Sequence, residues 1–222
     1  QGSHSAGGGW YGPPMIADES RVQRGGLLGL IFGRQANYVR RLVPLYILCL
    51  MGFFFSLVVG YEMGGSISTS VMDELMGAFP DFEGFDITMI FLFIVFNNVA
   101  KSFLFMVLGI IGSFPSLYFS IMNGFILGNV SYAVALERSL TFTVAALLPH
   151  GIIEVPTILL SSAAGMGIGY QLINRFRGRG GLGAEFRMAL RLFATRIIPL
   201  LFIAAVVEVT LTPLIVVFLG FA

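Results

Sequence analysis

The sequence predicts an all-α, polytopic membrane helix bundle of about five transmembrane helices. Of its 222 residues, 56% are hydrophobic and only 11% are charged, whereas a soluble domain has roughly 25% charged residues. A soluble protein of this length would need far more charge to cover its surface. Several apolar stretches are also long enough to cross about 30 Å of hydrocarbon, which takes about 20 helical residues.

The chain divides into three parts. Residues 1–9 contain Gln-Gly-Ser-His-Ser and Ala-Gly-Gly-Gly, which are typical of a protease remnant and a linker, so we exclude them from the fold. Residues 10–41 are a basic flank, and we expect either an interfacial segment on the cytoplasmic leaflet or a poorly ordered tail. Residues 42–222 are expected to form a single transmembrane helical domain.

Five helices are predicted within and up to the end of that domain. They cover residues 42–60, 87–112, 114–136, 140–170 and 195–221. The fourth contains Pro149 and Pro156. Because proline removes a backbone donor and clashes with the preceding turn, we expect this helix to be kinked or broken.

The distribution of arginine orients the predicted helices. One arginine cluster precedes the first helix and a second lies between the fourth and fifth, whereas residues 61–86 contain six acidic residues and no basic one. Lys and Arg are enriched in cytoplasmic loops. The sequence therefore predicts a multi-pass protein of the cell membrane with a cytoplasmic N-terminus and a C-terminus outside.

Polar residues inside the predicted helices identify a candidate site. A charge at the membrane centre costs roughly 2.5–3.5 kcal/mol, so it normally faces the bundle interior and has a partner. At a rise of about 1.5 Å per residue, the three charged residues and one asparagine lie at a common depth of about 20 Å. Helical spacing adds two asparagines and one histidine to this buried polar layer. Its members are Asn97, Asn98, Lys101, Asn123, His150, Glu154 and Glu208.

The chemistry of this layer leaves three alternatives open. It is either an internal ion-pair network that fixes helix register, a transport or ion site beside a broken helix, or a metal site formed by His150, Glu154 and Glu208. One histidine and two carboxylates are few ligands for a metal ion, and the sequence offers no further ligand beside them. We therefore predict neither a metal nor a cofactor.

Glycine spacing predicts close helix packing. Gly124 and Gly128 form one Gly-xxx-Gly step, and Gly165 and Gly169 form another. Such steps let helix backbones approach closely. We expect these contacts within one subunit, with a homo-oligomer contact as the alternative.

Signals for catalysis or nucleic-acid binding are weak. The chain has no zincin motif, nucleophile elbow or phosphate loop, and a serine dyad of His150 with Ser161 or Ser162 is less expected than helix packing by these small residues. The net charge of +1 argues against nucleic acid as a partner. We expect the lipid bilayer and protein partners, and no enzymatic activity.

The polar motifs, taken in order, resemble the stage II sporulation protein M family. They are Phe96-Asn97-Asn98-Val99-Ala100, Asn123-Gly124-Phe125-Ile126-Leu127-Gly128, Pro149-His150-Gly151-Ile152-Ile153-Glu154 and Ala163-Ala164-Gly165. The resemblance covers roughly residues 35–220 and implies a multi-helix membrane protein without known catalysis. In spore formers the family's namesake is a membrane scaffold that recruits peptidoglycan-degrading partners. The resemblance therefore favours a non-enzymatic scaffold, and the buried polar layer keeps a small-solute or ion transporter as the alternative.

Overall fold

The computed structural model describes residues 33–64, 86–178 and 181–219, apart from the side chains of Arg34, Pro149, His150 and Val216. Every element in these ranges is helical. The long helices are α2 (Ala36–Met63), α4 (Ile87–Val107), α5 (Ser113–Glu137), α6 (Leu140–Phe176), α7 (Leu182–Leu192) and α8 (Ile198–Phe218), with the short turns η2 (Gly33–Gln35), η4 (Leu108–Ile111) and η5 (Phe193–Ile197). Five stretches are long and apolar enough to cross a membrane. The predicted membrane helix bundle is confirmed.

The first helix begins earlier than residue 42. Helix α2 starts at Ala36, so Arg40 and Arg41 belong to its first turns and not to the flank that precedes it. Tyr38 and Val39 belong to the same hydrophobic core as residues of α6 and α7, and this burial stabilises the additional turn. Residues 1–32, which include the predicted remnant and most of the basic flank, lie outside the described residues.

The last membrane helix also begins earlier than predicted. The apolar stretch runs from Leu182 to Ile215, through α7, the π-helical turn η5 and α8. Proline at position 199 has no N–H to donate to the carbonyl group four residues before it. The π turn over Phe193–Ile197 widens the helix at this place, as π-bulges do where the regular hydrogen-bond ladder is interrupted.

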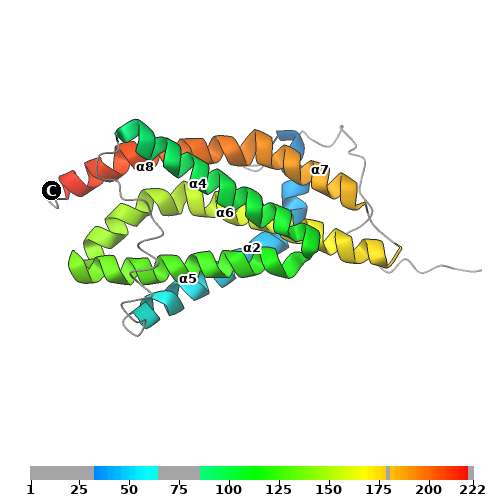
Figure 1. Ribbon diagram of the computed structural model, residues 1–222, viewed down its shortest axis with the longest axis horizontal. Coiled ribbons are helices and arrows are strands. Elements are labelled where there is room, and N and C mark those ends of the chain that lie inside the picture. Colours follow the sequence, from blue (N-terminus) through cyan, green and yellow to red (C-terminus); the bar gives the residue numbers. More distant parts are fainter. Residues whose placement is uncertain (1–32, 65–85, 179–180, 220–222) are drawn as a thin grey trace, which may run out of the picture.

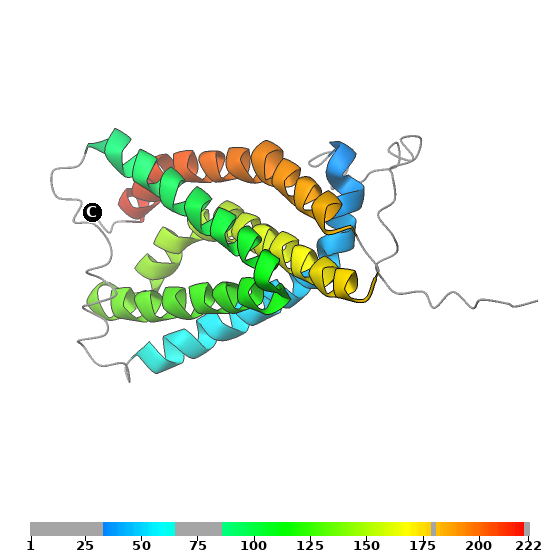
Figure 2. The same cartoon turned by 45° about the vertical axis from the view of Figure 1, so that its right-hand side comes forward.

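Helix α6 is the centre of the bundle. In Gly151–Phe176, 78% of an apolar 18-residue stretch is buried, against 22–28% in the other four candidate spans. The helix is continuous over Leu140–Phe176, so its prolines do not break it. Its first part is nevertheless inclined to the rest, which is the predicted kink (Figures 1 and 2).

Helices α2 and α5 pack against each other through glycine. A Cβ atom added at Gly124 would overlap the carbonyl oxygen of Phe53, and one at Gly128 would overlap that of Leu57. Across the same interface, the hydroxyl of Ser56 donates a hydrogen bond of 2.7 Å to the Ile121 carbonyl oxygen. The first predicted Gly-xxx-Gly step therefore brings two helices of one chain together.

The second Gly-xxx-Gly step, Gly165 and Gly169, lets the connection between α4 and α5 pack closely against α6. A Cβ atom at Gly165 would overlap the Phe105 carbonyl oxygen, and one at Gly169 would overlap the backbone at Gly112 and Ser113. Gly112 has a φ of 138°, which only glycine adopts readily. Both glycine steps are thus occupied by contacts within the chain and are not available to a second copy.

The two ends of the bundle differ in charge. The start of α2, the end of α6 and helix α7 lie together at one end (Figures 1 and 2). Five arginines are exposed there, and they are Arg40, Arg175, Arg177, Arg187 and Arg191. The exposed acidic residues of the described ranges lie at the other end of the bundle together with one exposed arginine, Arg138, and they are Glu62, Asp86 and Glu137. The two arginine clusters, which are far apart in the sequence, therefore share one end, defined here as the basic end.

Candidate functional site

Three helices meet at a charged junction inside the bundle, where α4, α6 and α8 pack pairwise against one another. Helix α4 contributes Lys101, α6 contributes Glu154 and α8 contributes Glu208. The ammonium group of Lys101 interacts electrostatically with both carboxylates. The side chain of Glu154 also accepts a hydrogen bond from Nδ2 of Asn98. We call these four residues the charged junction.

Helical spacing explains why these side chains point inward. On α4, Asn98, Ser102 and Phe105 are buried at intervals of four and three residues, and Lys101 lies beside this face. On α8, Ala204 and Ala205 are buried one turn before Glu208. Helix α6 is surrounded by other helices, so side chains on most of its faces are buried. Glu154 is one of them and is 1% exposed.

Apolar side chains are buried close to the junction, together with the hydroxyl-bearing residues Ser102 and Thr157. Phe105, Ile158 and Leu201 are buried one to two turns from the three ionisable residues. In such surroundings an ion pair is strong, but removal of one partner leaves a charge that water does not compensate. The arrangement can fix the relative positions of α4, α6 and α8, and it can exchange a proton or hold a charged group.

The other predicted members of the polar layer do not join this junction by hydrogen bonds. Asn97 and Asn123 are half-buried, and within the described residues neither bonds to the Glu154 carboxylate. Asn123 lies on α5, next in the sequence to Gly124, which packs against α2. The side chain of His150, which was also predicted to belong to the polar layer, lies outside the described part of the chain.

The two serines are engaged in hydrogen bonds within the bundle, and the metal alternative includes the side chain of His150, which lies outside the described residues. Ser161 donates a hydrogen bond of 2.6 Å to the Ser102 carbonyl oxygen, and Ser162 donates one of 3.4 Å to that of Ile158. Both lie on α6 at eleven or more residues from His150, which is a rise of about 16 Å. Among the described residues, no group of three His, Cys, Asp or Glu side chains could hold a metal ion.

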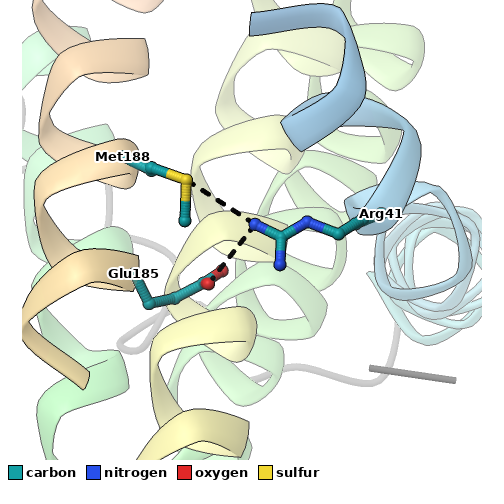
Figure 3. Close-up of polar contacts among 3 residues, drawn as sticks. All are labelled: Arg41, Glu185 and Met188. Carbon is teal, nitrogen blue, oxygen red and sulfur yellow. Dashed lines mark hydrogen bonds and ion pairs between the residues drawn. The ribbon is translucent and has the colours of Figure 1, made fainter. Parts of the chain in front are cut away.

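A second buried charge, which the sequence did not reveal, lies at the basic end. Nη2 of Arg41 on α2 lies 3.6 Å from Oε2 of Glu185 on α7 and donates to the Met188 sulfur at 3.7 Å. Figure 3 shows Arg41 reaching between these two side chains of α7. The guanidinium also lies over the Tyr38 ring, 5.4 Å from its centroid. This pair joins the start of α2 to α7.

One signal in the sequence would have indicated this pair. Glu185, Ala189 and Leu192 follow each other at intervals of four and three residues, and all three are buried in α7. A carboxylate on the apolar face of a short amphipathic helix requires a positive partner. The sequence alone does not say which of the many arginines is that partner.

The family model for stage II sporulation protein M matches residues 45–213. The chain belongs to the stage II sporulation protein M family. The matched segment runs from α2 into α8 and includes the whole charged junction, whereas Arg41 precedes it. A comparison with curated proteins and a comparison with solved structures each found no match. Membership of the stage II sporulation protein M family, expected from the polar motifs, is therefore confirmed, together with a multi-pass membrane protein.

Proposed function

We propose that this member of the stage II sporulation protein M family is a non-enzymatic membrane scaffold that recruits partner proteins. The observation that carries this proposal is the basic end. Its five exposed arginines come from α2, from α7, and from the last turn of α6 and the residue that follows it. These segments are separate in sequence and adjacent in the bundle (Figure 2). By the preference of Lys and Arg for the cytoplasmic side, this end faces the cytoplasm.

A docking surface that is already held in its binding shape binds a partner at a lower cost in entropy. The Arg41–Glu185 ion pair of 3.6 Å fixes α7 to α2, and the buried residues Ala189 and Leu192 of α7 pack in the main core with α6. The arginines at positions 187 and 191 are four residues apart and therefore project from one face of α7. A fixed basic face of this kind fits an acidic surface of a cytoplasmic protein.

Photo-crosslinking tests the scaffold. A photoreactive amino acid is placed at Arg187 or Arg191 at the basic end, and at the 73% exposed Phe55 on α2 as a lipid-facing control. We expect discrete protein adducts from the basic end and only lipid adducts from position 55. Neutralising Arg175 and Arg177 with glutamine should reduce the protein adducts. Equal adduct patterns at the basic end and at position 55 would contradict the proposal.

The charged junction supports a second candidate, a transporter for a small solute or an ion. Cysteines at Asn97, Thr157 and Thr212 report on access, because each lies about one helical turn from a charged residue of the junction. They are introduced in a Cys49→Ala background, since Cys49 is the free cysteine of the described residues, and labelled from each side with a charged thiol reagent. Labelling from one side that changes with ions favours transport, and protection from both sides favours the scaffold.

A further inference from the structure

A polar contact joins the turn that precedes α2 to the π turn η5. Nε2 of Gln35 donates a hydrogen bond of 2.9 Å to Oγ1 of Thr195, and Thr195 donates one of 2.7 Å to the Arg191 carbonyl oxygen one turn before it. Gln35 is the last residue of η2, and Thr195 lies within η5. The start of α2 and the helix that contains η5 lie beside each other (Figures 1 and 2). We call the contact between η2 and η5 the seam.

A guanidinium group lies half-buried at the seam. Nη2 of Arg196 would lie 3.5 Å from a Cβ atom added at Gly33, so the charged end of this side chain reaches the first residue of η2. Its Nε is buried and has no hydrogen-bond partner in the described part of the chain. A buried donor without an acceptor is destabilising, because it has lost the water that it bound in the unfolded chain. The seam therefore contains a positive charge and an N–H donor that a ligand could use.

The charge around the seam favours an anion as that ligand. Glu185 is the one carboxylate in the described parts of the basic end, and it lies 3.6 Å from Arg41. Oε1 of Gln35 also has no partner among the described residues, but an amide oxygen carries no charge that could balance a guanidinium. The five exposed arginines of the basic end increase the positive potential further.

The position of Arg196 on its helix makes the seam accessible from the lipid side. Thr195 and Ile198 are exposed, whereas Ile197 is buried, and Arg196 lies between these two faces. One turn further along α8, Phe202 is 49% exposed, as expected for an apolar side chain that faces acyl chains. An anion that reaches Arg196 along this face therefore carries its own apolar chain, and that combination is a phospholipid.

We propose that the seam between η2 and η5 binds the phosphate group of an anionic phospholipid, with Arg196 as the residue that pairs with it and the acyl chains along the exposed face of α8. A guanidinium presents parallel N–H donors that match two oxygens of a phosphate group. Basic sites between membrane helices bind anionic head groups, and the excess of arginine selects them over zwitterionic ones. The site does not use the side chains of Arg187 and Arg191, which the proposed protein partner would contact.

Native mass spectrometry of the full chain, freed of lipid in detergent, tests this site by counting bound lipid molecules. The chain is titrated with phosphatidylglycerol, which is anionic, or with zwitterionic phosphatidylcholine. We expect the wild type to bind one phosphatidylglycerol molecule in preference to phosphatidylcholine. Arg196→Gln should lower this preference about fivefold, which corresponds to about 1 kcal/mol for one basic residue near the membrane surface. Arg177→Gln, which removes an exposed arginine of the same end, is the matched control and should keep the preference.

Three results would overturn the proposal. The first is wild-type binding without preference for phosphatidylglycerol, which is also expected if Asp18 or Glu19, outside the described residues, supplies the anion. The second is an equal loss in Arg196→Gln and Arg177→Gln, which would indicate diffuse attraction by the whole basic end. The third is displacement of the lipid by millimolar inorganic phosphate, which would assign the seam to a free anion.

If Arg196→Gln does not fold, a measurement on the wild type decides. Phosphatidylglycerol with a photoreactive head group is crosslinked to the full chain, and the modified peptides are identified. We expect adducts within residues 33–44 or 193–203, on the two sides of the seam. Adducts confined to other parts of the chain would overturn the site. None of these outcomes depends on whether the protein recruits partners.

Discussion

Replacing Gly128 by alanine is expected to force α2 and α5 apart. The added Cβ atom would overlap the Leu57 carbonyl oxygen and would lie 2.7 Å from the Tyr61 amide nitrogen. Both atoms belong to the backbone of α2, so neither can rotate away as the end of a flexible side chain would. The two helices must separate, although among the described elements they have the most extensive contact in the fold.

The expected loss of folding free energy follows from two destabilising contributions and one stabilising contribution. Overpacking of a close interface costs about 1–3 kcal/mol. Separation also weakens the hydrogen bond of 2.7 Å from Ser56 to the Ile121 carbonyl oxygen, and such bonds in membrane proteins contribute about 0.6 kcal/mol. The higher helix propensity of alanine offsets about 1 kcal/mol. We expect a net loss of about 0.6–2.6 kcal/mol, a factor of about 3–80 in the folding equilibrium.

Reversible unfolding in mixed detergent micelles, followed by circular dichroism, measures this loss. Gly183→Ala is the matched control, because Gly183 is an exposed helical position of α7 with nothing within 4 Å of an added Cβ atom. The control should be unchanged or slightly stabilised. If Gly128→Ala unfolds with the same free energy as Gly183→Ala, the close approach of α2 and α5 is not what holds this interface together.

Three further predictions concern the polar contacts and the orientation. Asn98→Ala removes the donor to Glu154 and should destabilise the protein by about 1–3 kcal/mol in the same unfolding assay, whereas Asn97→Ala should have a much smaller effect. Arg41→Ala leaves the Glu185 carboxylate buried without its partner and should lower the free energy of unfolding by roughly 3 kcal/mol or less, because Arg41 is partly exposed. The control Arg40→Ala, which changes an exposed neighbour, should be close to wild type. Equal losses in the two variants would contradict the role of the ion pair. A cysteine at Arg187 should react with a membrane-impermeant thiol reagent in inverted vesicles, which expose the cytoplasmic side, and not in intact cells. Labelling in intact cells would reverse the proposed orientation.

The membrane helices were the part of the fold that could be predicted best. Their length and apolar composition are set by the thickness of the bilayer, so all five stretches could be located without knowledge of their neighbours. The ends were less accurate at Ala36 and Leu182. There the helix continues because polar or amphipathic turns are buried against other helices, and a hydrophobicity pattern does not contain that information.

The candidate site could be predicted in part. A common depth for Lys101, Glu154 and Glu208 follows from helix rise alone, and the structure places these three residues together. The same depth argument included Asn123, which lies on α5, a helix that contributes none of the three charged residues. Depth fixes the position along the membrane normal but not the direction in which a side chain points around its helix.

The sequence by itself determined that this chain crosses a membrane, where the crossings lie and which family it belongs to, because these properties depend on composition, length and local motifs. Only the tertiary structure decided which helices are neighbours. It placed α6 at the centre, paired α2 with α5 through Gly124 and Gly128, and joined Arg41 to Glu185 across most of the chain. The physical reason is that lipid is as apolar as the helices themselves, so hydrophobicity inserts each helix but does not select its partner. That selection depends on close backbone packing and on the few buried polar groups, whose partners are defined only in three dimensions.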